Sequence, residues 1–178
     1  GVAFSGALEV QLNTLTVART VDEISIKPGV AVAGLGVSLE VMGQRLTGDF
    51  AFSKDSATGE ITLAMANVTL ALGDGARTYV TATIASGAVV VTRGGVVGAV
   101  VAGIALNPDV LPGVVVSGTV IVQLNNTAAD VSRTITIGTD PVTLSIPKNT
   151  LLIQAGLPGA GASITVLGQT LTGVALFQ

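Results

Sequence analysis

Two segments of this chain recur further along it in the same order. Residues 1–13 (GVAFSGALEVQLN) match residues 113–125 (GVVVSGTVIVQLN), and residues 37–48 (VSLEVMGQRLTG) match residues 162–173 (ASITVLGQTLTG). The first match is offset by 112 residues and the second by 125, which indicates a duplication with a variable stretch between the two blocks. We therefore expect a first repeat unit over residues 1–112 and a partial second unit over residues 113–178, cut from a longer array.

The composition favours strands over helices. Charged residues make up 11% of the chain, well below the usual ~25%, and aromatic residues only 3%. Most apolar residues are Val, Ala, Ile and Leu, which together with Thr are typical of strands that enclose a narrow core. The most apolar stretch, residues 96–106, is too short for the ~20 residues of a membrane helix, so we expect no membrane insertion.

The composition also removes several kinds of chemistry. The chain has no Cys and no His, which excludes disulfides, thiolate metal sites and the commonest general base. The net charge is −3, and the eight basic residues are scattered along the sequence. This distribution argues against a nucleic-acid partner and against binding to anionic lipid headgroups.

Alternation of apolar and polar side chains predicts strands along most of the chain. The even positions of residues 2–12 form one apolar face, which we expect to be buried, so that a charge at Val10 or at its match Val122 would abolish folding. The phase of the alternation slips between Met65 and Val68, which predicts a bulge or corner near Asn67. The even face comprises Val2, Phe4, Gly6, Leu8, Val10 and Leu12.

A shorter rhythm runs beneath the long repeat. A small or polar residue followed by Gly or Asn recurs, often 15–20 residues apart, and one coil of a β-solenoid takes roughly this length. The sequence therefore predicts an all-β, solenoid-like tandem repeat. The alternative is a pair of tandem β-sandwich domains, since ~100 residues per sandwich also fit the offset of 112. The recurring pairs are Ser5-Gly6, Thr47-Gly48, Ala66-Asn67, Ser86-Gly87, Ala102-Gly103, Ser117-Gly118 and Thr172-Gly173.

The stretch between the matched blocks is the most plausible place for a binding surface. It covers residues 14–36 in the first copy and 126–161 in the second, where it is 13 residues longer. A length difference at one place in a repeat usually marks a surface loop or an extra hairpin. The apolar content also suggests lateral packing, with Val97, Val101 and Ala105 on a covered outer face.

Acidic turns are the candidate ligands for a metal. Asp49, Asp74 and Asp109 could donate oxygens to calcium, but calcium sites need six to eight oxygens, usually from carboxylates close in sequence. The glycine-rich calcium nonapeptide and the EF-hand loop are both absent. We interpret the three residues as turn formers, expect no cofactor, and keep calcium as the one ion that could bind.

Carboxylate pairs for glycoside cleavage are not predicted either. Glu9 and Glu40 are replaced by Ile121 and Thr165 in the second copy, and a catalytic role does not fit a residue that lapses in the neighbouring repeat. The other two glutamates are Glu23 and Glu60.

The remaining candidate catalytic and binding patterns are incomplete. Ser5 and Ser117 have no His partner, and the glycine-rich residues 93–98 do not begin a helix that could cradle a phosphate. We therefore expect no enzyme activity and no catalytic, cofactor or metal residues. The basic residues Lys54, Arg77 and Arg93 are too scattered for a polysaccharide lyase, and the threonines Thr78, Thr81 and Thr83 do not form the ladder that ice binding needs.

Three polar residues and one glycine recur between the copies and are interpreted as structural. Gln11 and Asn13 return as Gln123 and Asn125, and the pair Gly43-Gln44 returns as Gly168-Gln169. A Gly-Gln pair between two alternating runs is typical of a tight turn, whereas buried Gln or Asn side chains could stack as a ladder.

At the two matched blocks the chain resembles the long tandem repeats of giant bacterial secreted and cell-surface proteins of the RTX-type, adhesin-like group. The resemblance is carried by SGxxxVQLN at residues 5–13 and GQxLTGxxxF at residues 43–52. It implies an extracellular or cell-surface location, and no catalytic residues carry over. We therefore expect a structural repeat of an extracellular bacterial fibre, stalk or filament that assembles by end-to-end β-stacking of neighbouring copies. The alternative is an adhesion module that binds glycan or another surface through residues 126–161.

Overall fold

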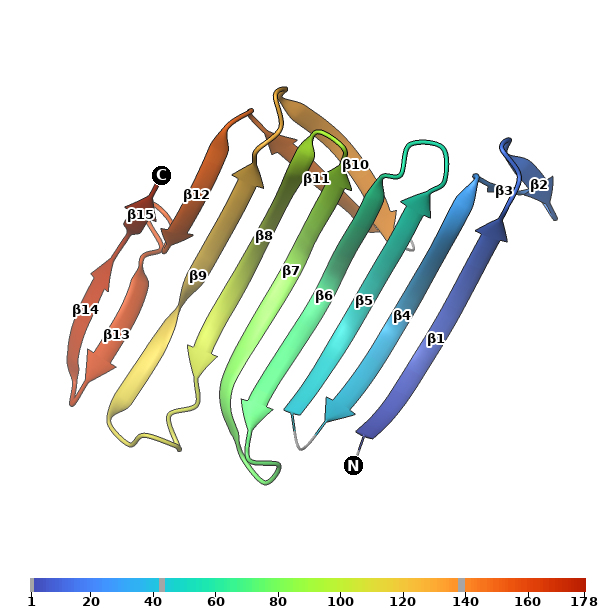
Figure 1. Cartoon of the computed structure of the whole chain (residues 1–178). Coiled ribbons are helices and arrows are strands. Elements are labelled where there is room, and N and C mark those ends of the chain that lie inside the picture. The colour runs from blue at the N-terminus through green and yellow to red at the C-terminus, as the bar shows by residue number, and fades with distance from the viewer. Residues whose placement is uncertain (1, 42–43, 138–139) are drawn as a thin grey trace.

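The computed structural model describes residues 2–41, 44–137 and 140–178 (Figure 1). Every regular element in this part of the chain is a strand, so the predicted all-β class is confirmed. No described helix has the length and apolar character that a membrane span requires. Seven long strands follow one another as antiparallel neighbours: β1 (Val2–Asn13), β4 (Gly29–Val41), β5 (Gln44–Asp55), β6 (Ile61–Gly73), β7 (Thr78–Thr92), β8 (Gly95–Leu106) and β9 (Val114–Asn125).

Four shorter strands complete this sheet beyond β9. The second half of β9 pairs with β12 (Thr150–Ala155) and its first half with β13 (Ala162–Val166). Strand β14 (Gln169–Gly173) pairs with β13, and β15 (Ala175–Phe177) pairs with β12. The result is one eleven-stranded sheet with β1 at one edge and β14 and β15 at the other (Figure 1).

Two hairpins lie outside the sheet order. The short one, β2 (Arg19–Val21) with β3 (Ile24–Ile26), connects β1 to β4. The long one, β10 (Val131–Ile137) with β11 (Asp140–Ile146), connects β9 to β12 and lies across one face of the sheet, where it contacts β5 to β9 (Figure 1). We call the covered side the hairpin face and the opposite side the open face.

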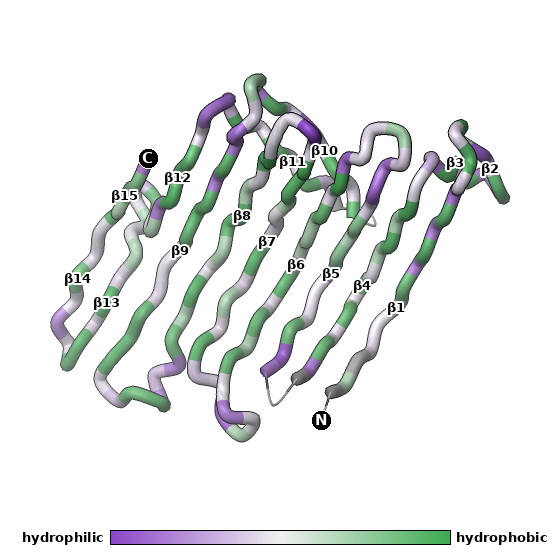
Figure 2. The backbone as a smooth tube through the Cα atoms, viewed as in Figure 1, coloured by the Kyte–Doolittle hydropathy of each residue, from purple (hydrophilic) through white to green (hydrophobic). Residues whose placement is uncertain are grey.

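The core lies between the long hairpin and the sheet. Small alanines on β6 and β7 let the hairpin approach closely, and larger side chains of β10 and β11 fill the space above them. Hydrophilic residues gather mainly at the turns and strand ends (Figure 2). The buried cluster comprises Ala64, Ala66, Ala88, Val90 and Val97 from the sheet and Ile137, Val142, Leu144 and Ile146 from the hairpin.

Three members of the short glycine rhythm lie at bulges in the middle of strands. Pairing shifts beside Gly6 in β1, Gly48 in β5 and Asn67 in β6, and these residues have φ angles of 138°, 150° and 54°. A Cβ on Gly6 or Gly48 would lie 2.8 Å from the Cα of Val37 or Val68, so glycine is required at both places. The bulge predicted near Asn67 is confirmed, and the three bulged positions lie near one another across β1, β5 and β6.

Neither solenoid coils nor a pair of packed sheets is found in the described part of the chain. Each strand pairs antiparallel with its neighbour, whereas a solenoid stacks its coils with parallel strands, and the second layer is a single hairpin. The unit boundary predicted between residues 112 and 113 lies in the connection from β8 to β9, which pair with each other. The sheet is therefore continuous across that boundary.

The predicted burial of the even face of residues 2–12 is wrong. Leu8, Val10 and Leu12 are 56%, 66% and 67% exposed, because β1 is an edge strand and these residues point to the open face. Val122, the match of Val10, is also exposed. The side chains of Val2 and Phe4 lie outside the described set.

Candidate functional site

A buried asparagine ends the first strand of the first repeat and anchors the hairpin that follows. The Asn13 Nδ2 donates to the carbonyl oxygens of Val17 and Ile26 at 2.9 and 3.0 Å. The Asn13 Oδ1 accepts a hydrogen bond from the Leu15 N–H at 3.0 Å. The side chain thereby ties both ends of the β2–β3 hairpin to the end of β1.

Asn125 repeats this arrangement at the end of β9. Its Nδ2 donates to the carbonyl oxygens of Ala129 and Ile146 at 3.0 and 2.9 Å, and its Oδ1 accepts from the Thr127 N–H at 3.0 Å. Asn125 is fully buried, so the loss of these partners would leave buried polar groups unsatisfied. The recurring asparagines are thus hairpin anchors, a role that neither the turn nor the ladder interpretation described.

Strand pairing repeats with the same offsets as the sequence. Ser5 lies opposite Ser38 in the β1–β4 pair, and Ser117 lies opposite Ser163 in the β9–β13 pair. Equivalent residues of the two copies differ in number by 112 before the hairpin, by 121 in β12 and by 125 from β13 onward. The 13 additional residues therefore lengthen the hairpin and widen the break between those two strands. Strands β12 and β13 together occupy the place of β4, and β14 and β15 occupy that of β5.

The strands at the two edges of the sheet each have an equivalent strand inside the sheet. The inner strand is paired on both sides, whereas no described strand pairs with the outer side of the edge strand. Strand β9 pairs with β8 on its second side, with Asn125 opposite Val97 and Val122 opposite Val100. Among the described strands, β1 pairs in the sheet only with β4, so its equivalent side is free. Likewise β5 pairs with β6, whereas β14 and β15 have no described strand on that side.

The Gln44 side chain links β5 to its neighbour β6. Its Oε1 accepts from the Gly73 N–H at 2.8 Å, and its Nε2 donates to the Gly73 carbonyl, so the amide joins the start of β5 to the end of β6. Gln169, the match of Gln44, is exposed on the edge strand β14. Gly43 lies outside the described residues, so the tight turn predicted there stays a prediction.

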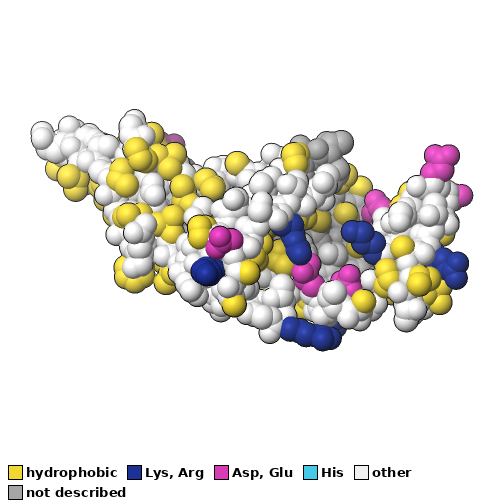
Figure 3. Space-filling model, turned by 90° about the horizontal axis from the view of Figure 1, so that it is seen from above, with side chains coloured by type: hydrophobic (Ala, Val, Ile, Leu, Met, Phe, Trp, Pro, Cys, Tyr) yellow, Lys and Arg dark blue, Asp and Glu magenta, His cyan; other side chains and the backbone are white. Residues whose placement is uncertain are grey.

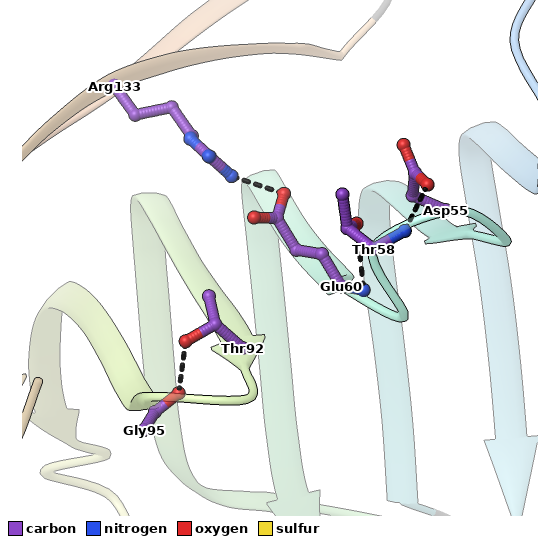
Figure 4. Close-up of polar contacts among 6 residues, drawn as sticks. All are labelled: Asp55, Thr58, Glu60, Thr92, Gly95 and Arg133. Carbon is purple, nitrogen blue, oxygen red and sulfur yellow. Dashed lines mark hydrogen bonds and ion pairs between the residues drawn. The ribbon is translucent and has the colours of Figure 1, made fainter.

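A groove of about 610 Å³ separates the two hairpins on the hairpin face, and charged side chains gather over this end of the sheet (Figure 3). Arg133 of β10 points toward the sheet and forms an ion pair with Glu60, the residue just before β6 (Figure 4). Both side chains are partly exposed, so the pair adds little stability and mainly fixes the hairpin over β6. Among the described residues that line the groove, no hydrogen bond joins a serine or threonine hydroxyl to a lysine or carboxylate side chain.

The turn before Glu60 is built by its own polar groups. The Asp55 carboxylate accepts from the N–H groups of Thr58 and Ala57 at 2.9 and 2.7 Å, and these bonds lower its pKa. The Thr58 hydroxyl oxygen in turn accepts from the Glu60 N–H at 3.2 Å, while the Thr92 hydroxyl donates to the Gly95 carbonyl in the neighbouring turn (Figure 4). These contacts are turn chemistry that positions Glu60 toward Arg133.

The three acidic turn residues lie in separate places. The Asp49 carboxylate accepts from the Gly36 N–H at 2.7 Å beside the bulge. The Tyr79 hydroxyl and the Arg77 and Ala76 N–H groups donate to Asp74 and lower its pKa from 3.8 to about 2, while the same bond raises the Tyr79 pKa.

Asp109 belongs to a turn in which its N–H donates to the Asn107 Oδ1 at 3.0 Å. Within the described ranges, no group of three or more carboxylates is close enough to hold a metal ion.

The four glutamates are equally dispersed. Glu9 accepts from the Gln11 amide at 2.6 Å on β1, Glu23 lies in the turn of the short hairpin with a φ angle of 67°, and Glu40 is exposed on β4. Of the glycine-rich residues 93–98, residues 93 and 94 form the tight turn between β7 and β8, and residues 95–98 begin β8. Lys54 lies on β5, Arg77 before β7 and Arg93 after it.

A row of hydroxyl side chains on the hairpin face is a feature that the sequence analysis missed. Ser38, Thr47, Thr69 and Thr83 lie directly opposite one another on four neighbouring strands, and Ser5 extends the row to β1. Only the antiparallel register reveals this row, because its members are far apart in sequence. Thr78 and Thr81 lie outside it on β7.

The predicted covered positions on β8 have different outcomes. Val97 is buried beneath the long hairpin, whereas Val101 is 37% exposed and Ala105 is also exposed beyond the hairpin. The hairpin face is therefore covered over only part of its extent.

A comparison with known protein families, with curated proteins and with solved structures finds nothing that matches this chain.

Proposed function

We propose that this chain is a structural repeat module of an extracellular bacterial fibre, stalk or filament. In this proposal, neighbouring copies assemble end to end through the open edges of the sheet. The observation that carries it is that β9 is an inner strand with partners on both sides, whereas on one side of its equivalent β1 no described strand is paired. An unpaired strand edge is a ready template for a further strand.

The equivalence of β1 and β9 fixes the expected register at the junction. The β8 strand of a preceding copy would pair with β1 as the present β8 pairs with β9. Asn13 would then lie opposite Val97 of that copy, and Val10 opposite its Val100. Extension in this proposal occurs by antiparallel strand addition, and the solenoid coil expected from the sequence is not needed for it.

The short hairpin supports the same direction of growth. Figure 1 shows β2 and β3 beyond β1, away from the rest of the sheet. In hairpin register, Arg19 opposite Ile26 corresponds to Val131 opposite Ile146, so Ile24 takes the place of the buried Leu144. Ile24 is 51% exposed here and would cover the β8 strand of the preceding copy.

The location and the source rest on the likeness of the two blocks to repeats of secreted and cell-surface proteins. The sheet supports an architectural role, because its described part contains no cluster of metal ligands and the polar residues that recur in both copies anchor backbone. Adhesion through residues 126–161 is the alternative. It would have to use the outer side of the long hairpin, where the Thr134 and Thr143 hydroxyls lie 3.2 Å apart, since the inner side packs on the sheet.

Cysteine trapping tests the junction, and the chain offers a clean background because it contains no Cys. A copy of residues 44–112 is placed before Gly1, which reproduces the natural link between residues 112 and 113. We expect Val100→Cys in the added copy to form a disulfide with Val10→Cys, since directly opposed strand residues fall within disulfide reach. The control pair is Val100→Cys with Val122→Cys in the original chain. Efficient control trapping without trapping at the junction would contradict the proposal.

A further inference from the structure

The open face of the sheet is apolar over its whole width. Three neighbouring rows of side chains cross it from β1 toward β12, on the opposite side from the long hairpin. Every described member of these rows is glycine or apolar except Lys54. The rows are Leu8, Gly34, Phe50, Met65, Gly87, Val100, Val122 and Ile153; Val10, Val32, Phe52, Leu63, Val89, Gly98, Leu124 and Leu151; and Leu12, Val30, Lys54, Ile61, Val91 and Val96.

The hairpin face provides a comparison for the open face. Beneath the long hairpin the buried residues of the sheet are Ala and Val, and beyond the hairpin lies a row of Ser and Thr. The buried apolar cluster of that face thus lies where another layer covers it, and Val101 beyond the hairpin is an exposed exception. On the open face Phe52, Leu63 and Ile153 are 37%, 39% and 44% exposed, and no described element covers them.

The open face is also large, and neighbouring side chains fill the space beside its glycines. Side chains lean over its glycines: the Val37 Cγ2 lies 2.6 Å from the position of a Cβ on Gly34, and the Val100 Cγ2 lies 3.1 Å from that on Gly87. The seven long strands, spaced ~4.8 Å apart with a rise of ~3.3 Å per residue over about 12 residues, offer roughly 1,300 Å². A stable interface needs about 800 Å² from each partner, so the area is sufficient.

We propose that the open face packs against the open face of a second copy of this chain, as the two inner faces of a sandwich. A twofold axis would bring the same apolar surface to both sides, and such a contact closes on itself without charge complementarity. Sheets packed in this way lie ~10 Å apart. Lys54 stands in the row at the turn end of β5, where its ammonium group can stay in solvent.

A second copy fits this face better than a lipid surface. Proteins that contact the membrane interface carry Trp and Tyr there, and this chain has no Trp and a single Tyr, which bonds to Asp74 in a turn. The net charge of −3 also disfavours anionic headgroups. The proposal does not depend on end-to-end assembly, since it uses a face of the sheet and not an edge.

The first test measures the mass of the full chain by sedimentation equilibrium. We expect a dimer of the 17.6 kDa chain as the smallest assembled species. The double variant Phe52→Lys/Leu63→Lys charges two directly opposed residues at the centre of the open face and should be monomeric with an unchanged circular dichroism spectrum. The matched control is Thr47→Lys/Thr69→Lys, which charges an opposed pair on the same two strands on the hairpin face and should stay dimeric.

A second measurement covers the case in which the lysine variant fails to fold. Leu63→Cys and Thr69→Cys are each labelled with a maleimide at low and at high protein concentration. We expect the Leu63→Cys thiol to react at least ~10-fold more slowly at high concentration, because mass action favours the covered form, and the Thr69→Cys rate to stay unchanged. A monomeric native chain, a dimer that survives both lysines, or Leu63→Cys protection only by neutral lipid vesicles would overturn the proposal. A failed junction trap with intact dimers would contradict the end-to-end proposal alone.

Discussion

The two hairpins share one anchor and differ in what they cover. Asn13 and Asn125 each form hydrogen bonds with three equivalent backbone groups. These belong to the residues two and four positions further along the chain and to the last residue of the hairpin. The short hairpin has three-residue strands and exposed apolar side chains, whereas the long one has seven-residue strands and buries Ile137, Leu144 and Ile146. The asparagine therefore fixes where a hairpin leaves the sheet, and the sheet beneath it decides whether the hairpin becomes part of a core.

The difference follows from position in the sheet. The long hairpin turns back over strands that precede it, and β5 to β8 are there to receive it. The short hairpin turns in the equivalent direction, where β1 is the outermost of the described strands. The short hairpin therefore adds little to the stability of the fold, whereas the long hairpin stabilises it. Equivalent substitutions in the two hairpins should show this difference.

Truncation of the hairpin side chains should give the largest contrast. Leu144→Ala removes a fully buried side chain and should lower the free energy of unfolding by about 3 kcal/mol. Ile24→Ala, at the corresponding hairpin position, should change it by less than about 0.5 kcal/mol, because that side chain is exposed. Urea denaturation followed by circular dichroism measures both, and equal losses would mean that the short hairpin already packs on the sheet.

The anchors should differ next. Asn125→Ala leaves two buried carbonyl groups and one N–H without their partner and should cost about 2 kcal/mol. Asn13→Ala removes the same bonds from a hairpin that covers nothing, so water can replace them and the loss should be about 1 kcal/mol or less. The same urea titrations decide the matter, and a larger effect at Asn13 would reverse the ranking of the two hairpins.

Much of the local structure could be predicted from sequence because it depends on local chemistry. The phase slip between Met65 and Val68 located the bulge at Asn67. The length difference between the copies pointed to a surface loop or an extra hairpin, whereas both copies carry a hairpin and the additional residues lengthen the second one. The matched blocks also fixed equivalent positions, which return as equivalent strand pairs.

The larger arrangement could not be predicted, for physical reasons. A glycine with positive φ serves a coil corner and a mid-strand bulge equally well, so the rhythm around Gly6 and Gly48 did not distinguish them. Alternation along β1 showed that two faces differ, but an element more than 100 residues away decides which face of the sheet is covered. The ion pair of Glu60 with Arg133 joins residues 73 positions apart and has no local signal.

The bulge at Gly48 offers a third contrast between the copies. A Cβ at Gly48 would lie 2.8 Å from the Val68 Cα at a φ angle of 150°, so Gly48→Ala should cost about 1–2 kcal/mol. At the equivalent Gly173 nothing lies within 4 Å of that position, so Gly173→Ala should be close to neutral. Thermal unfolding compares the two variants. In the extended array, where a β6 strand would pair with β14, we expect Gly173→Ala to become as costly as Gly48→Ala, and an unchanged value there would argue against strand addition at this edge.

The ion pair across the groove should give the smallest effect and the most specific one. Arg133 belongs to the long hairpin and Glu60 to the sheet, whereas the corresponding position of the short hairpin is the apolar Val21. Arg133→Gln should lower the free energy of unfolding by only about 0.5 kcal/mol, since both groups are partly exposed, and high salt should remove the difference from the native chain. The double variant Arg133→Gln/Glu60→Gln isolates the coupling between the two side chains. If Arg133→Gln costs as much as Leu144→Ala, the charged contact and not the apolar inner side holds the hairpin on the sheet, and the contrast between the two hairpins would then lie in that single pair.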